Sequence, residues 1–188
     1  MIKVGIDEVG RGSWAGPLVI GAVSLTKPII GITDSKLLSI NQREKLAKEI
    51  YLKSEYSSLG WVWPHEIDSL GLTKATRLAI LRALSNLDPN DLEVILDGKY
   101  NFLGSKYRVK TIIKADMLIP SVSAASIIAK VARDNYMKSI DQYFSAYDFK
   151  NHVGYGTAKH RAALEANGPC ALHRISFRPV NKEVFNLI

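Results

Sequence analysis

The chain begins MIKVGIDEVGRGSWAG (residues 1–16), and this stretch organises the interpretation of the rest. Residues 2–6 are typical of a strand, and two adjacent carboxylates, Asp7 and Glu8, follow directly. Acidic side chains are rarely buried unless they are paired or bound to a cation. A glycine-rich turn with one arginine comes next, and a second apolar run lies at residues 18–25 (LVIGAVSL). The sequence therefore predicts a hairpin with two carboxylates beside its turn.

The composition is that of a globular protein with a basic surplus. The 188 residues suit one domain, and a hydrophobic content of 47% is enough for a sizeable core. Twenty-five Lys and Arg against 18 Asp and Glu give a net charge of +7. This is consistent with a polyanionic partner such as nucleic acid, with a merely basic surface as the alternative.

The expected setting is the cytoplasm. No apolar run approaches the length of a membrane span, and no signal peptide is expected before the first strand. Cys170 is the single cysteine, which excludes a disulfide framework and favours a reducing compartment.

Further along the chain, helices are predicted to alternate with strands. Ser39 and Gln42 match a capping box before a helix that continues to about residue 53. The other predicted elements are strands at 57–63, 94–96 and 109–113 and helices at 72–87, 121–144 and 157–167. Small residues at the start of the 121–144 helix predict close packing on a sheet. The pattern indicates an α/β fold, a mixed sheet with helices on its faces.

Three of the predicted strands run into acidic residues, namely Asp7 with Glu8, Asp97 and Asp116. If these strands are neighbours, the carboxylates converge at one edge of the sheet, where they favour hard cations such as Mg²⁺ or Mn²⁺. Asp97-Gly98 is also a common turn pair, and Asp116 could pair with Lys114. Since adjacent strand residues point to opposite faces, Asp7 and Glu8 share a site only if the strand twists or ends there.

Motifs along nearly the whole chain resemble those of the ribonuclease HII family, the type 2 ribonucleases H. Residues 5–19 (GIDEVGRGSWAGPLV) resemble its DEAGRG motif, and residues 33–44 (TDSKLLSINQRE) are similar to its DSKKLS…RE segment. Residues 64–72 (PHEIDSLGL), 114–116 (KAD) and 121–134 (SVSAASIIAKVARD) are similar to further blocks of the family. GYGTAKH…GP…HRISF resembles GYPTKEH…GP…HRRSF. Gly156 stands where that last motif has proline, which predicts a looser turn, and Ile175 stands where it has arginine.

The resemblance implies a ribonuclease H-like fold, with a five-stranded mixed sheet flanked by helices. It implies a single catalytic domain over residues 1–188 with a short C-terminal helical segment. It implies an endonuclease that hydrolyses the RNA of RNA–DNA hybrids and incises on the 5′ side of single ribonucleotides embedded in duplex DNA, as in ribonucleotide excision repair. The products would carry 3′-hydroxyl and 5′-phosphate ends.

The resemblance also implies the site residues. The catalytic carboxylates, which would hold two Mg²⁺ or Mn²⁺ ions, are Asp7, Glu8, Asp97 and Asp116. The turn and the aromatic ring expected at the ribonucleotide are Gly10, Arg11, Gly12 and Tyr155. The candidates for contacts with the phosphates are Lys36, Lys130, Arg133, Lys159, His160 and Arg174.

Three alternatives rank below this interpretation. The sister family ribonuclease HIII usually carries an additional N-terminal domain and GKG in place of GRG. A nucleic-acid-binding module without catalysis would lack some of the carboxylates, and a small-molecule Mg²⁺ enzyme would not need the basic surplus. A monomer is expected. Recruitment by a sliding clamp is left open, because no obvious clamp-binding tail is visible.

Overall fold

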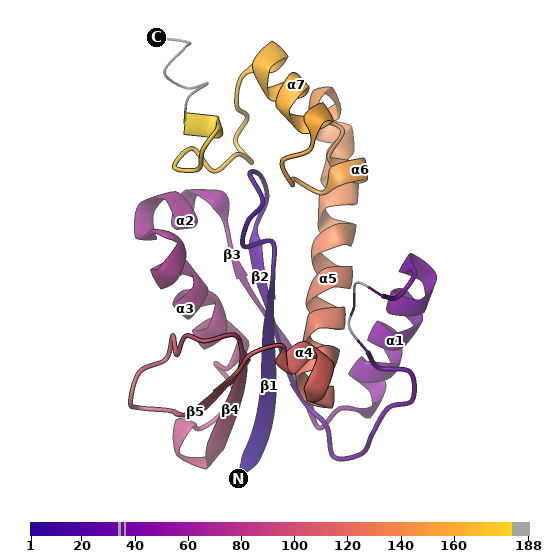
Figure 1. Ribbon diagram of the computed structural model, residues 1–188, viewed down its shortest axis with the longest axis vertical. Helices are drawn as coiled ribbons and strands as arrows, with labels where there is room; N and C mark the ends of the chain where they lie inside the picture. Colours follow the sequence, from indigo (N-terminus) through magenta and orange to yellow (C-terminus); the bar gives the residue numbers. More distant parts are fainter. Residues whose placement is uncertain (34, 36, 182–188) are drawn as a thin grey trace.

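The computed structural model describes residues 1–33, 35 and 37–181, and within these ranges five strands form one mixed sheet (Figure 1). The strands are β1 (Ile2–Val9), β2 (Leu18–Ser24), β3 (Tyr56–Val62), β4 (Leu92–Asp97) and β5 (Arg108–Ile112). Their order across the sheet is β3-β2-β1-β4-β5. β1 is antiparallel to β2 and parallel to β4, which is parallel to β5. The carboxyl ends of β1, β4 and β5 therefore lie at the same edge.

Helices cover both faces of this sheet. Figure 1 shows α2 and α3 on one side and α5 with α1 on the other. The helices are α1 (Ile40–Lys53), α2 (Pro64–Leu70), α3 (Leu72–Ala83), α4 (Ala115–Leu118), α5 (Pro120–Ile140), α6 (Phe149–His152) and α7 (Ala158–Asn167). The predicted α/β class and the five-stranded mixed sheet are confirmed. Among the helices in the described ranges, none combines the length and apolarity needed to cross a membrane.

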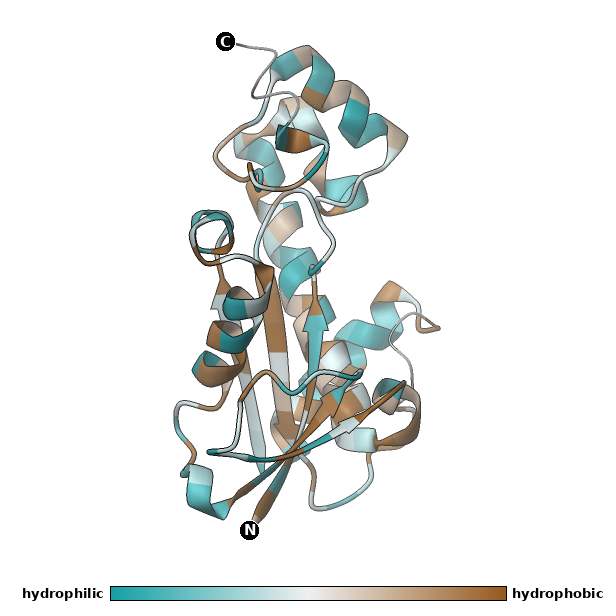
Figure 2. Cartoon of the chain, turned by 60° about the vertical axis from the view of Figure 1, so that its left-hand side comes forward, coloured by the Kyte–Doolittle hydropathy of each residue, from teal (hydrophilic) through white to brown (hydrophobic). Residues whose placement is uncertain are grey.

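Hydrophobic residues pack on both faces of the central strands. In Figure 2, brown marks hydrophobic residues, and these strands carry much of it. On one face, Val4 and Ile6 of β1 pack in a buried cluster with Ile80 of α3. On the other face, Val23 of β2 packs in a second cluster with Ile127 of α5. The alternation of side chains along the strands places these two clusters on opposite sides.

Glycines bring α5 unusually close to the sheet. A Cβ at Gly5 would lie 2.4 Å from the backbone nitrogen of Val122, and one at Gly21 would lie 2.1 Å from the carbonyl oxygen of Ala125. Any side chain at either position would push the helix away. The predicted close packing of the small N-terminal half of this helix is confirmed.

Several element boundaries differ from the prediction. β1 continues to Val9, because its pairing with β2 extends to Val9↔Val19. α3 ends at Ala83, and the apolar pattern that continues to residue 87 belongs to a turn in which the Leu87 N–H bonds the Leu84 carbonyl. α5 ends at Ile140, where a short 3₁₀ turn follows. The short helices α2, α4 and α6 were not predicted.

The predicted start of α1 is correct. The Gln42 N–H donates to Ser39 Oγ at 3.3 Å, and the Ser39 N–H donates to Gln42 Oε1 at 2.8 Å, which completes the capping box. This reciprocal pair satisfies two backbone donors at the end of the helix.

The end of α5, together with α6 and α7, forms a lobe at the top of Figure 1, beside the turn that joins β1 to β2. An isolated antiparallel bridge between Ala15 and His173 joins the lobe to this turn. Phe149 and Tyr147 stack at 5.4 Å in the interior of the lobe. The hairpin turn therefore touches both the sheet and the lobe.

Candidate active site

Asp7 and Glu8 lie where β1 leaves its parallel neighbour. β1 pairs with β4 only as far as Ile6↔Leu96, although it continues alongside β2 through Glu8↔Ile20. The strand therefore does not end at Asp7, which was one of the two conditions expected for Asp7 and Glu8 to share a site. It is the pairing with β4 that ends, which opens the strand edge to both side chains.

A cavity of about 320 Å³ opens at this edge and collects residues from distant parts of the chain. Its lining is Asp7, Glu8, Val9, Ser35, Asp97, Asp116, Ser126, Lys130 and Tyr155. The structure thus brings the four predicted carboxylates and the predicted aromatic ring to one cavity. Ser126, whose hydroxyl hydrogen-bonds Asp7, was not predicted as a site residue.

Backbone geometry positions the two carboxylates that come later in the chain. Asp97 ends β4, and its Oδ1 accepts a hydrogen bond of 2.7 Å from the Ala115 N–H. Lys114 has a left-handed conformation (φ 59°, ψ 36°) and turns the chain from β5 into α4. The Ser123 hydroxyl donates to the carbonyl oxygen of Asp116 at 2.5 Å. These contacts tie the end of β4 to the start of α5 through α4.

The cavity is unfavourable for negative charge on Asp7. The pKa of Asp7 is raised to about 7, mainly by burial and also by the charges of Glu8 and Asp97, against a hydrogen bond from Ser126 that lowers it. Burial also raises the pKa of Glu8, with Arg11 acting in the opposite direction. Arg11 Nη1 lies 3.3 Å from Glu8 Oε1. Several carboxylates thus share a partly desolvated space with few countercharges.

This donor set fits divalent metal ions. Carboxylate oxygens are the ligands that Mg²⁺ and Mn²⁺ prefer, and a buried carboxylate with like charges beside it needs a positive partner to ionise. Within the described ranges, no three acidic, histidine or cysteine side chains already form a metal-binding group.

Hydrogen bonds from two side chains to backbone carbonyls hold the turn from Gly10 to Gly12. Gly10 has φ +85°, and the Ser13 hydroxyl donates to its carbonyl oxygen at 2.8 Å. Nη1 of the buried Arg174 donates to the Arg11 carbonyl at 3.0 Å. A Cβ at Gly12 would meet nothing within 4 Å, so this part of the turn is open to a ligand.

Tyr155 lies in a compact turn. Its ring has the Arg133 guanidinium at 5.3 Å and the Lys130 ammonium at 5.9 Å. Next to it, a Cβ at Gly156 would lie 2.1 Å from Cζ2 of Trp14. The expectation of a looser turn at Gly156 was incorrect, because the Trp14 indole packs against the glycine where a side chain would otherwise lie.

The predicted phosphate contacts divide into three groups. Lys159 is exposed, 3.9 Å from Asp148, and Lys130 lines the cavity, where it pairs with Asp134 at 2.9 Å. Lys36 lies outside the described residues. The third group is buried, so the expectation that its members contact phosphate directly is corrected; these residues are Arg133, His160 and Arg174.

The physical reason for this correction is internal hydrogen bonding. The Arg174 guanidinium donates to the carbonyl oxygens of Gly16 and Arg11, and Arg133 donates to the carbonyls of Pro17 and Val153. The ring of His160 bonds to other buried groups of the lobe. These side chains support the turns at Arg11 and Tyr155 from within.

Comparison with known proteins is consistent with this geometry. The family model described as ribonuclease HII matches residues 4–180. Ribonuclease HII of Streptomyces coelicolor is 44% identical over 178 residues, which cover 94% of this chain and 76% of the relative. Among solved structures, the ribonuclease H2 of Pyrococcus horikoshii OT3 matches with a TM-score of 0.82 and 27% identity, covering 99% of this chain and 98% of that one. The RNase HII in a complex with PCNA from Archaeoglobus fulgidus matches with a TM-score of 0.79 and 26% identity, covering 95% and 96% of the two chains.

Proposed function

The chain belongs to the ribonuclease HII family, and on this premise we propose that it incises duplex DNA on the 5′ side of a single embedded ribonucleotide. Membership makes it a ribonuclease H, an endonuclease that degrades RNA paired with DNA and depends on divalent metal ions. The finer proposal adds the embedded ribonucleotide, Mg²⁺ or Mn²⁺ as the metal, two ions during catalysis, and products with 3′-hydroxyl and 5′-phosphate ends.

One observation carries the proposal. Four carboxylates and Tyr155 line the same cavity, and the Arg11 side chain is anchored on Glu8 at its rim. A phosphodiester among the carboxylates would therefore lie beside an aromatic ring and near the turn whose Arg11 bonds Glu8. Backbone groups of an open glycine turn can approach a 2′-hydroxyl, the group that distinguishes RNA from DNA at a single position.

The residues at the cavity have different roles in the proposed reaction. Asp7, supported by the Ser126 hydroxyl, and Asp97, supported by the Ala115 N–H, present oxygens from two neighbouring strands. Glu8 holds Arg11 at the rim, and Lys130 supplies a positive charge on the α5 side of the cavity. When bound, divalent ions supply an activated water and a countercharge for the leaving oxygen. Tyr155 packs against the sugar at the junction and fixes which phosphodiester lies at the carboxylates.

The test is incision of a labelled DNA duplex that contains one ribonucleotide, with Mg²⁺, with Mn²⁺ and with EDTA. A metal-dependent cut on the 5′ side of the ribonucleotide is the expected result. Tyr155→Ala should reduce this incision more than it reduces cleavage of a long RNA–DNA hybrid, and Tyr155→Phe is the matched control because it keeps the ring. Cleavage of long hybrids alone would remove the embedded-ribonucleotide proposal and leave the family assignment in place.

Cytoplasmic location and a monomeric state are part of the proposal, and recruitment by a sliding clamp is an open question that can be tested. The solved neighbour from Archaeoglobus fulgidus is in a complex with PCNA, which supports testing a clamp partner. Size-exclusion chromatography of the protein alone tests the monomeric state, and co-elution with a sliding clamp would establish recruitment by the clamp.

A further inference from the structure

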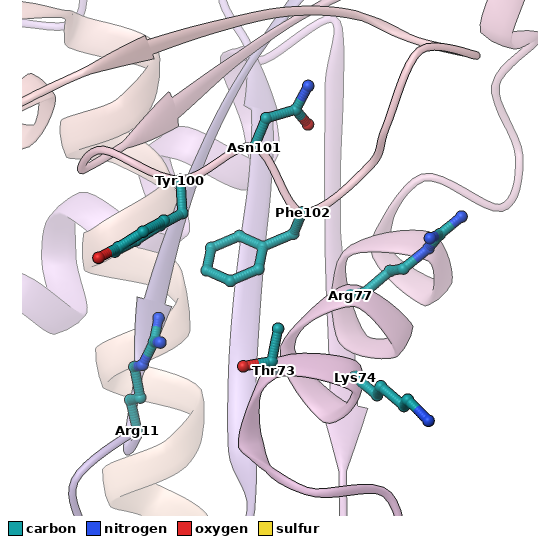
Figure 3. A pocket seen from close by; sticks show the side chains of 7 residues that line it. All are labelled: Arg11, Thr73, Lys74, Arg77, Tyr100, Asn101 and Phe102. Atoms are coloured by element: carbon teal, nitrogen blue, oxygen red, sulfur yellow. The ribbon is translucent and has the colours of Figure 1, made fainter.

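A second cavity, larger than the one at the carboxylates, lies on the other side of Arg11. Its volume is about 560 Å³, and Figure 3 shows it between the start of α3 and the loop that follows β4. Its lining is Arg11, Thr73, Lys74, Arg77, Tyr100, Asn101 and Phe102. Three of these residues are cationic, two are aromatic and none is acidic, a combination typical of surfaces that bind single nucleic-acid strands.

Two of the three cations in this cavity are available for a ligand. Lys74 and Arg77 are exposed, and their spacing of three residues places them on the same side of α3. Within the part of the chain that the structure describes, neither forms an ion pair. Two exposed cations without an acidic neighbour form a site for a phosphate group.

Tyr100 offers a free aromatic surface on a fixed loop. Its side chain is 68% exposed, whereas the Phe102 ring is covered by the Arg11 guanidinium at 5.3 Å. The Asn101 side chain accepts from the Leu103 N–H at 2.9 Å, and Leu103 is buried in the main core. The loop therefore presents Tyr100 to solvent from a position fixed by its neighbours.

The two cavities are linked by a bonded pair of lining residues, one from each cavity. Arg11 lines the second cavity and bonds Glu8, which lines the first. Asp97 lines the first cavity, and Tyr100 follows it by three residues and lines the second. A strand with its phosphodiester at the carboxylates can therefore pass over Arg11 into the second cavity without leaving the protein surface.

We propose that the second cavity binds a nucleotide of the substrate that flanks the cut, with its phosphate on Lys74 and Arg77 and its base on Tyr100. This inference rests on the proposed function, since the ligand is a further part of the same nucleic acid. It assigns this cavity to binding, because none of the carboxylates at the first cavity lines it.

The test is binding of a fluorescent RNA–DNA hybrid to the full chain in EDTA, over a series of salt concentrations. Replacing Lys74 and Arg77 together with Gln should weaken binding and reduce the slope of log Kd against log salt by about 1 for each phosphate that the variant no longer neutralises. Tyr100→Ala should weaken binding about fivefold or more with the slope unchanged, because stacking involves no counterion release. With metal present, the loss of binding should appear as a higher KM for the hybrid.

Matched controls come from the C-terminal part of α1. Lys48→Gln and Tyr51→Ala remove the same kinds of exposed side chain, and α1 leads into the first residue of β3, Tyr56, which pairs with the last residue of β2. This end of the sheet is opposite to the carboxylates, so both controls should bind as the wild type does.

The outcomes separate the two proposals. If the wild type incises the duplex with one embedded ribonucleotide, and the variants at Lys74, Arg77 and Tyr100 bind the hybrid with wild-type Kd and slope, the inference about the second cavity is overturned and the proposed function stands. Equal weakening in the α1 controls would also overturn it. If the wild type neither binds nor cuts hybrids, the proposed function fails and the inference fails with it.

Discussion

The Arg174 guanidinium donates a hydrogen bond of 3.0 Å to the backbone carbonyl of Arg11, from a fully buried position in the C-terminal lobe. Its other nitrogens donate to the Gly16 carbonyl at 3.0 and 2.9 Å. Burial and the neighbouring Arg133 lower the pKa of Arg174 to about 9. Arg174 thus fixes the turn that carries Arg11, which lines the second cavity and bonds Glu8 of the first.

Arg174→Lys should therefore act on substrate binding through Arg11. Lysine keeps the charge but cannot reproduce the planar fork of donors, so the turn loses part of its support. We expect KM for a hybrid to rise about fivefold with a smaller change in kcat, and the free energy of unfolding to fall by about 2 kcal/mol. Steady-state kinetics and thermal unfolding measure both quantities.

Arg108→Lys is the control for the Arg174 substitution, since Arg108 is exposed on β5. It should leave KM and stability near the wild-type values. Loss of stability in Arg174→Lys without any change in KM would show that the lobe supports the fold and does not position Arg11.

Asp7→Asn should abolish turnover while sparing binding. The substitution replaces one of the oxygens that we propose hold the metal and removes one negative charge from the cavity, and loss of that charge cannot weaken attraction to phosphate. We expect kcat to fall by about a thousandfold or more, with Kd for the hybrid in EDTA equal to or below the wild-type value. Asn90→Asp, on an exposed turn, is a control for surface charge. Retained turnover in Asp7→Asn would overturn the assignment of this carboxylate.

The same substitution should stabilise the metal-free protein at neutral and alkaline pH. The pKa of Asp7 is about 7 in the folded protein, above its ordinary value of 3.8, mainly because of burial. The stabilising effect of the protonated carboxyl is present below the unfolded pKa and is lost as the pH rises through 7. In EDTA, Asn at this position should therefore raise Tm by several degrees at pH 8 and by little at pH 4. A constant difference in Tm across this range would contradict the role of burial.

Much of the site could be predicted because it depends on short local patterns. Asp7 and Glu8 lie near the end of β1, Asp97 ends β4, and Asp116 lies shortly after β5; parallel strands bring these ends together. The roles of Arg174 and His160 could not be predicted, because charged and polar side chains are usually exposed. Only the folded chain reveals the buried carbonyl and ring partners that these side chains satisfy.

The contact between Trp14 and Gly156 could not be predicted from the sequence either. The two residues are far apart in sequence, and a glycine in place of proline suggests flexibility when it is considered alone. In the folded chain the Trp14 indole packs against this glycine and lies where a Cβ would be. A residue that departs from a family motif therefore has to be interpreted together with the neighbour that fills the space of the missing side chain.

Gly156→Ala should disturb the Tyr155 turn. The new Cβ would lie 2.1 Å from Cζ2 of Trp14, so that the indole or the turn must shift. We expect incision at an embedded ribonucleotide to fall about fivefold or more relative to cleavage of long hybrids, because only the former depends on Tyr155 at the junction. Adding Trp14→Leu should restore part of the loss, which a double-mutant cycle measures. Equal losses on both substrates would argue against a junction role for this turn.

His160 and His173 should make the protein sensitive to acid. Their Nε2 atoms lie 3.0 Å apart in the interior of the lobe. Burial, together with the charge of neighbouring histidines, lowers the pKa of both to about 4. Since the unfolded histidines take up protons near pH 6.5 and the folded ones do not, the free energy of unfolding should fall by a few kcal/mol from pH 6.5 to 4.

The measurement for this pair is Tm as a function of pH for the wild type and for the double variant His160→Gln, His173→Gln. Comparing the two cancels the opposite contribution of Asp7 in metal-free protein. The double variant should be less stable at pH 7.5, because glutamine cannot reproduce the packing and hydrogen bonds of the buried rings, and should lose less stability on acidification. His65→Gln, at an exposed position of α2, should keep the wild-type profile. Parallel pH profiles for the wild type and the double variant would show that the two buried rings take up protons as easily in the folded protein as in the unfolded chain.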